Sequence, residues 1–268
     1  MTTGSMAFRA FPSGAPRRAT TGAIAVVLAG LLLAGCGPNR RRDRDAAAAA
    51  DAASEATYQA EVEEGIGAAV AILVDTSGSM RERAPGDSRP KYVVAQEALA
   101  AMLDATDAFV ARRPDFPIKI GVYSFSSGVH VQRPIQTYDR AGVRATIENL
   151  PRPGGGTAIG DAMREARPDL YRAGVFRKYL LVVTDGENTN GRPPDEIARD
   201  IFRKSEGAVQ IYFVAFDTNP DKFAFLKEVG GDVIGASSGP ELRTALDGIY
   251  QGKILAEATG GERDAVKK

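Results

Sequence analysis

Short, nearly continuous apolar runs recur along the chain, and each has the length of a strand. They are residues 68–74, 118–125, 179–183 and 209–215, with a shorter run at Val233-Ile234. Apolar runs of this length predict strands that are covered on both faces, as in a parallel sheet. Residues 129–131, Val-His-Val, alternate instead, which predicts an exposed edge strand around His130.

Between these runs, apolar residues recur every three or four positions, which predicts helices. The longest pattern contains Ala95, Leu99, Met102, Ala105 and Phe109. Further helices are expected at residues 140–150, 158–173, 194–206 and 221–229. A last helix begins at Ser238, with Glu241 placed as in a capping box, and runs through Ile254. Alternating strands and helices predict an α/β fold, a doubly wound, mostly parallel central sheet flanked by helices.

The N-terminal segment has a different pattern. Arg9, Arg17 and Arg18 precede an uncharged apolar run at residues 23–34, the layout of an export signal. A helix over this run would rise about 18 Å, less than the roughly 30 Å of a bilayer core. Residues 1–35 are therefore expected to be a signal peptide, with twin-arginine export or an uncleaved anchor as alternatives.

The signal ends in Leu33-Ala34-Gly35-Cys36, which resembles the bacterial lipobox and contains the chain's one cysteine. The resemblance implies that Cys36 is lipidated and becomes the first residue of a protein anchored to a membrane of the bacterial cell envelope. Gly37 stands where enteric lipoproteins of the inner membrane carry Asp, which favours the outer membrane, facing the periplasm.

Residues 36–65 are expected to be an Arg- and Ala-rich tether, residues 66–256 the globular domain, and residues 257–268 a polar tail. The basic run at residues 40–44 lies beside the expected anchor, where it could contact anionic lipid or be a solvated charge run.

Composition excludes several classes of protein. The 268 residues carry 34 Lys+Arg against 34 Asp+Glu, so the chain lacks the basic excess of a nucleic-acid-binding protein. One Cys excludes disulfides and multi-thiolate zinc sites within the chain. One His excludes sites that need two imidazoles.

Oxygen-bearing side chains collect where predicted strands end. Asp75, Ser77 and Ser79 follow the first strand, Asp185 follows the run at 179–183, and Thr157 follows three glycines. Ligands of parallel sheets bind at the carboxyl ends of the strands. Hydroxyl and carboxylate oxygens suit Mg²⁺, Mn²⁺ or Ca²⁺ rather than Zn²⁺ or Cu²⁺. Because two carboxylates leave such an ion short of negative charge, it should attract a further anionic ligand.

These segments, in this order, resemble the metal-ion-dependent adhesion site (MIDAS) of von Willebrand factor type A (VWA) domains, over about residues 66–256. The resemblance implies that Ser77 and Ser79 ligate Mg²⁺, and that Thr157 does so directly or through water. It implies that Asp75 and Asp185 act mostly through water and hydrogen bonds to those hydroxyls, and that a partner's acidic side chain fills the sixth position. The alternative is a metal-free site in which these residues only cap and brace a turn.

Other polar residues near these motifs could have either a structural or a functional role. Glu187 and Asp161 are candidates for an outer shell, or for surface and cap roles. Residues 80–91 form a polar stretch that either rims the site and selects partners or connects two elements.

The expected function is therefore a lipid-anchored binding module, not an enzyme, that binds an exposed Asp or Glu of a protein through Mg²⁺ (or Mn²⁺ or Ca²⁺), with no nucleic-acid partner. A metal-dependent hydrolase or phosphatase is one alternative. No GxSxG motif surrounds Ser77 or Ser79, His130 is the one candidate base, and Ser77 stands where a haloacid-dehalogenase-like phosphatase has a second Asp. The other alternative is an accessory subunit of an ATP-driven assembly machine, whose ATPase would be a separate chain.

Overall fold

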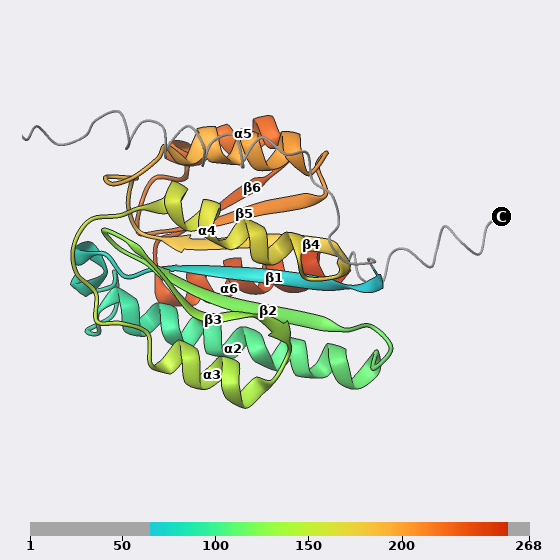
Figure 1. Ribbon diagram of the computed structural model, residues 1–268. Helices are drawn as coiled ribbons and strands as arrows, with labels where there is room; N and C mark the ends of the chain where they lie inside the picture. The colour runs from blue at the N-terminus through green and yellow to red at the C-terminus, as the bar shows by residue number, and fades with distance from the viewer. Residues whose placement is uncertain (1–64, 257–268) are drawn as a thin grey trace, which may run out of the picture. The chain divides into compact units, whose positions relative to one another are not determined.

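A computed structural model of the protein describes residues 65–256 (Figure 1). The expected signal peptide, Cys36, the tether up to residue 64 and the tail at 257–268 lie outside the described residues. Within 65–256, no helix combines the length and the apolar character needed to cross a membrane.

The described residues form a six-stranded sheet in the order β3-β2-β1-β4-β5-β6. Its strands are β1 (Gly65–Asp75), β2 (Ile118–Phe125), β3 (Val129–Thr137), β4 (Val175–Thr184), β5 (Val209–Phe216) and β6 (Asp232–Ala236). Every neighbouring pair is parallel except β2 and β3, which run antiparallel at one edge. This confirms the predicted fold class. The order reverses at β1, so the ligand-binding crevice of such a sheet is expected between the ends of β1 and β4.

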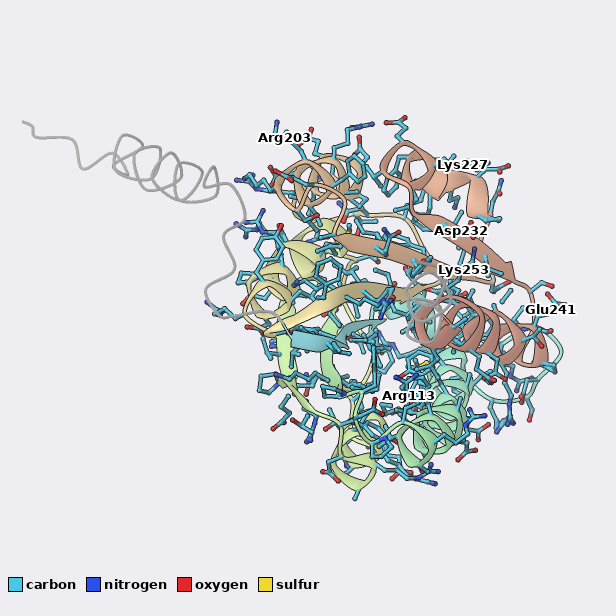
Figure 2. The ribbon with its side chains drawn as sticks, turned by 90° about the vertical axis from the view of Figure 1, so that its right-hand side faces the viewer. Arg113, Arg203, Lys227, Asp232, Glu241 and Lys253 are labelled. Atoms are coloured by element: carbon cyan, nitrogen blue, oxygen red, sulfur yellow. The ribbon has the colours of Figure 1, made fainter. Side chains whose placement is uncertain are left out.

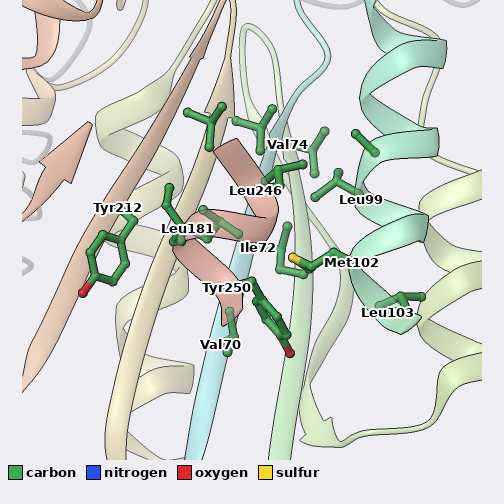
Figure 3. Packing of buried hydrophobic residues seen from close by; sticks show 14 of the residues in the cluster. Val70, Ile72, Val74, Leu99, Met102, Leu103, Leu181, Tyr212, Leu246 and Tyr250 are labelled. Carbon is green, nitrogen blue, oxygen red and sulfur yellow. The ribbon is translucent and has the colours of Figure 1, made fainter. Parts of the chain in front are cut away.

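Helices cover both faces of the sheet (Figure 1). On one face lie α2 (Lys91–Arg112), α3 (Arg140–Glu148) and α6 (Gly239–Ile249); on the other lie α4 (Ile159–Tyr171) and α5 (Pro194–Lys204). β1 explains the division, because its side chains alternate. Val70, Ile72 and Val74 pack with α2 and α6 in one core (Figure 3), whereas Ala69, Ala71 and Leu73 pack with α4 and α5 in the other.

Several elements differ from the sequence expectation in length or type. β4 begins at Val175, ahead of the apolar run, because Arg177 and Lys178 pair with β1 through their backbone. The segment expected as a helix at 221–229 is the 3₁₀ segment η2 (Pro220–Val229), interrupted by non-helical torsions at Phe223. α6 continues as the π-helical turn η3 (Tyr250–Leu255).

The cap of α6 also differs in one contact. Ser238 accepts a hydrogen bond from the Glu241 amide at 3.4 Å, as in a capping box. The Glu241 carboxylate, however, accepts from the amide and hydroxyl of Ser237, at 2.9 and 2.7 Å. Glu241 therefore holds the residue before the cap as well as supporting the helix start.

Charged side chains of both signs are mixed over the face seen in Figure 2. The labelled residues include the basic side chains of Arg203, Lys227 and Lys253 and the acidic side chains of Asp232 and Glu241. His130 lies exposed on the edge strand β3, as expected.

Candidate metal centre

The ends of β1 and β4 lie side by side, and this brings two of the predicted segments together. Val74 pairs with Val183, so Asp75 and Thr184 end adjacent strands. Ser77 and Ser79 follow directly, Ser77 as the cap of the short 3₁₀ turn η1 (Gly78–Arg81) and Ser79 within it. Asp185 follows β4.

Asp75 is bonded to the start of this turn. Its carboxylate is fully buried, accepts a hydrogen bond from the Ser77 amide at 2.7 Å, and accepts another from the Thr184 hydroxyl at 2.6 Å. Burial raises the pKa of Asp75 to about 6, although the bonds from Thr184 and Ser77 lower it in part. Thr184, whose hydroxyl makes this bond, was not singled out from the sequence.

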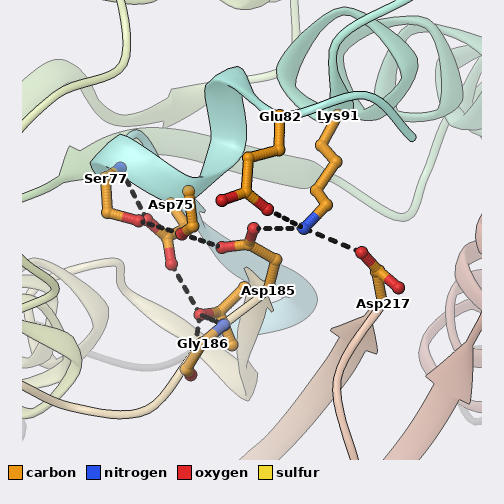
Figure 4. Close-up of polar contacts among 9 residues, drawn as sticks. Asp75, Ser77, Glu82, Lys91, Asp185, Gly186 and Asp217 are labelled. Atoms are coloured by element: carbon orange, nitrogen blue, oxygen red, sulfur yellow. Dashed lines mark hydrogen bonds and ion pairs between the residues drawn. The ribbon is translucent and has the colours of Figure 1, made fainter. Parts of the chain in front are cut away.

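The hydroxyls of Ser77 and Ser79 form a pair above Asp75. Their Oγ atoms are 3.1 Å apart, and Ser79 donates to Oδ1 of Asp185 at 2.7 Å (Figure 4). Two neighbouring ligands of an octahedral Mg²⁺ at 2.0–2.1 Å lie about 2.9 Å apart, whereas Ca²⁺ ligands at right angles lie about 3.3–3.7 Å apart. The 3.1 Å separation is that of a hydrogen bond and lies between these two values, so both hydroxyls can reach one hard cation of either size.

The glycine-rich loop reaches the same edge of the sheet. The Gly154 amide donates to the Thr76 carbonyl at 2.8 Å, and the Gly78 amide donates to the Gly155 carbonyl at 3.0 Å. Gly155 has φ +81°, which is accessible to glycine and strained for other residues. These bonds fix the segment that leads into the buried Thr157 against the turn that carries Ser77.

A buried lysine contacts Asp185 at this site, and it was not among the residues predicted from the sequence. Lys91 opens α2 and is 4% exposed. Its Nζ lies 3.1 Å from Oδ2 of Asp185, 2.8 Å from Oδ2 of Asp217 and 3.3 Å from Oε2 of Glu82 (Figure 4). Burial lowers the pKa of Lys91, but the contacts with Asp217 and Asp185 raise it more, so the ammonium stays charged.

A signal for this group existed in the sequence. Asp217 comes directly after β5, at the same edge as Asp75 and Asp185, and so belongs to the set of acidic residues at strand ends. Lys91 and Glu82 belong to the polar stretch at 80–91, whose residues give no periodic sign of burial.

The two outer candidates have ordinary contacts. Glu187 pairs with Lys222 at 2.9 Å, and Asp161 accepts from the Arg192 amide at 3.4 Å. Among residues 65–256, no three His, Cys, Asp or Glu side chains form a group that could hold a metal ion. The donor set of this site therefore depends on hydroxyls.

Comparison with known proteins gives a match over part of the sequence and a shared fold. Residues 70–187 match the sequence model of the von Willebrand factor type A domain. Residues 65–256 have the α/β fold of that domain, as a similar solved structure, a von Willebrand factor type A protein from Catenulispora acidiphila, shows. It has a TM-score of 0.55 and 21% identity over 73% of this chain and 43% of that one. No curated protein matches the sequence.

Two further solved structures share the fold. The PilB minor pilin from Streptococcus sanguinis has a TM-score of 0.59 at 15% identity, over 74% of this chain and 63% of the pilin chain, so the match spans less than two thirds of that protein. Proximal thread matrix protein 1 from the mussel byssus, with zinc in its MIDAS motif, has a TM-score of 0.53 at 21% identity, over 74% of this chain and 47% of that chain.

Proposed function

We propose that the chain is a bacterial cell-envelope protein, anchored through a lipid on Cys36. Its VWA domain binds a protein partner through Mg²⁺ at Asp75, Ser77, Ser79, Thr157 and Asp185. The partner supplies an Asp or Glu side chain as the remaining ligand.

The observation that carries the proposal is the placement of the Ser77 and Ser79 hydroxyls, 3.1 Å apart, with Asp185 bonded to Ser79 at 2.7 Å. Hydroxyl and carboxylate oxygens are hard donors, which suit Mg²⁺. The zinc-occupied MIDAS of the mussel protein supports a divalent ion at this position of the fold. When bound, the ion supplies a Lewis-acidic contact for a carboxylate, and Ser77 and Ser79 hold it without adding charge.

Binding is favoured over hydrolysis by the contacts of the two serines. Ser79 donates its hydroxyl to a carboxylate, not to an imidazole. The chain's one histidine, His130, lies on β3, which β2 separates from β1. A Ser-His-acid arrangement needs the serine and the imidazole in contact.

Calorimetric titration of the purified protein with Mg²⁺ tests the metal centre. One site is expected in the wild type and none in Asp185→Ala, while circular dichroism shows that both are folded. Equal Mg²⁺ binding by Asp185→Ala would refute the assignment.

Crosslinking in intact cells tests the partner. A captured protein is expected to be lost after EDTA treatment and in Thr157→Ala, and to need one particular acidic residue of its own. Capture that survives EDTA would mean that another surface recognises the partner.

A further inference from the structure

The group behind the metal centre is a lysine that the fold encloses. Lys91 is 4% exposed, and lysine is almost never fully buried unless it is paired. Three segments meet its ammonium: the turn with Glu82, the loop after β4 with Asp185, and the loop after β5 with Asp217 (Figure 4).

The two oxygens of Asp185 have different partners. Oδ1 accepts from the Ser79 hydroxyl at 2.7 Å, and Oδ2 lies 3.1 Å from the Lys91 ammonium. The Asp185 side chain is fully buried. A partial turn of the carboxylate would break one of these contacts, so Lys91 fixes its plane, with one oxygen at the ammonium and the other at the hydroxyl pair.

Asp217 holds the lysine from the far side. Its backbone has φ +54°, a left-handed conformation that Asp tolerates better than most residues. Its amide donates to the Ala236 carbonyl at 2.7 Å, which fixes the residue at the end of β5. The left-handed conformation of Asp217 thus occurs at the position that places its carboxylate 2.8 Å from the Lys91 ammonium.

We propose that Lys91 is a positioning residue that sets the charge of the metal centre: it partly neutralises Asp185 by contact with one carboxylate oxygen, and this contact keeps the other oxygen directed at Ser79. This inference rests on the proposed metal-binding function. The ammonium and the metal ion repel each other, so Lys91 weakens metal binding. Because Asp185 is already partly neutralised, the bound ion keeps more positive charge for an external carboxylate.

The proposal predicts effects of opposite sign, which a purely structural role would not produce. Loss of the ammonium should strengthen metal binding and weaken carboxylate binding to the loaded centre. A lysine that only braced the loops would, when removed, weaken both.

The experiment uses the full-length protein in detergent, with Mn²⁺ and acetate as probes. Electron paramagnetic resonance of free Mn²⁺ measures metal affinity, and water-proton relaxation of the Mn²⁺-loaded protein measures displacement of water by acetate. Lys91→Met is expected to bind Mn²⁺ about tenfold more tightly and acetate about threefold more weakly, on the scale of one partly screened unit charge. Lys91→Arg, which keeps the charge, is expected to restore values near wild type.

Two further variants complete the design. Lys204→Met removes another buried lysine, paired with Asp200 at 3.0 Å on α5, and should change neither affinity. Asp217→Asn leaves the lysine in place and removes a negative charge, so it should weaken Mn²⁺ binding and strengthen acetate binding even if Lys91→Met does not fold.

The outcomes separate the two proposals. A wild-type protein that binds no Mn²⁺ refutes the metal centre itself. Wild-type binding with unchanged or weaker Mn²⁺ affinity in folded Lys91→Met, or with Asp217→Asn shifting in the same direction as Lys91→Met, overturns the role of Lys91 alone.

Discussion

Thr184 donates its hydroxyl to Oδ2 of Asp75 at 2.6 Å, and this bond joins the ends of β4 and β1. Both side chains are fully buried. The carboxylate therefore receives hydrogen bonds from a hydroxyl and a peptide N–H while burial disfavours its charge.

Asp75→Asn should stabilise the metal-free protein and abolish metal binding. The pKa of Asp75 is raised from 3.8 to about 6 in the folded state, so the charged form opposes folding. This penalty is absent below about pH 4, grows as the pH rises to about 6, and is then on the order of 3 kcal/mol. The asparagine amide can donate to Thr184 while its oxygen accepts from Ser77.

Denaturant unfolding in EDTA at pH 4, 6 and 8 measures this effect. The stability gained in Asp75→Asn should grow between pH 4 and pH 6, and Mg²⁺ should no longer raise its melting temperature. A variant less stable than wild type at pH 8 in EDTA would contradict the prediction.

Ser79→Ala should lose Mg²⁺ binding while the domain stays folded, because it removes one hydroxyl of the pair and the bond to Asp185. Removal of one such hydrogen bond changes stability by about 1 kcal/mol. Thermal unfolding with and without Mg²⁺ checks this, and Ser88→Ala, at an exposed loop serine, is the matched control. A Mg²⁺-induced rise of equal size in Ser79→Ala would show that its hydroxyl is not a ligand.

Gly155→Ala should lower the affinity for Mg²⁺ while the domain stays folded. Its φ is +81°, and a Cβ there would lie 2.5 Å from Oγ of Ser127, which accepts a hydrogen bond from the Gly156 amide, so either this bond is lost or the loop before Thr157 shifts. Gly86 is the control: its φ is +74°, and a Cβ would meet nothing within 4 Å.

Each alanine adds about 1 kcal/mol of backbone strain. Chemical denaturation of both variants should show a loss of stability in each, larger in Gly155→Ala because of the added contact with Ser127. Mg²⁺ calorimetry should show loss of metal affinity in Gly155→Ala alone. Equal metal affinities in the two variants would show that the conformation of the glycine loop does not affect metal binding, which would contradict the prediction.

Tyr250→Phe should reduce the alkaline sensitivity of the domain. Tyr250 is fully buried and bonds to the Thr106 hydroxyl at 2.9 Å, and burial raises its pKa to about 12. Between pH 10 and 12 the tyrosine ionises in the unfolded chain but not in the folded one, so stability falls as the pH rises.

At pH 7 the free energy of unfolding of the variant should be about 1 kcal/mol lower than that of wild type, because one hydrogen bond is missing. At pH 11 this difference should be smaller. Urea unfolding at the two pH values measures the difference. The same difference at both would contradict the raised pKa.

Cys36→Ser should abolish acyl labelling and release the protein from the membrane fraction, because the lipobox resemblance assigns the acyl chain to this cysteine. Metabolic labelling with a fatty acid, followed by fractionation, measures both. Asp185→Ala serves as the control, since it alters the metal centre and should keep its label. Unchanged labelling of Cys36→Ser would contradict the anchor.

The sheet and the convergence of the site segments could be predicted because both depend on local patterns. Continuous apolar runs marked β1, β2 and β5 to within a few residues, and oxygen-bearing residues directly followed β1 and β4. The start of β4 was missed because Arg177 and Lys178 interrupt its apolar pattern, although their backbone still pairs with β1.

Lys91 could not be assigned from its neighbours in the sequence. Its burial depends on Asp185 and Asp217, which are distant in the chain and come together only through the order of β4 and β5. The torsions at Phe223 that break η2 likewise have no counterpart in the helical pattern of residues 221–229. Contacts between distant segments decide the burial of Lys91.

β1 runs from Gly65, the first described residue, to Asp75 at the proposed metal centre. At about 3.3 Å per residue, the two ends are roughly 33 Å apart. If Cys36 carries the proposed lipid anchor, residues 37–64 can separate the anchor from the domain by at most about 100 Å. A partner held by the same membrane would then meet the centre at an effective concentration near the millimolar range. At such an effective concentration, a carboxylate contact with a dissociation constant of about 1 mM would be occupied about half of the time.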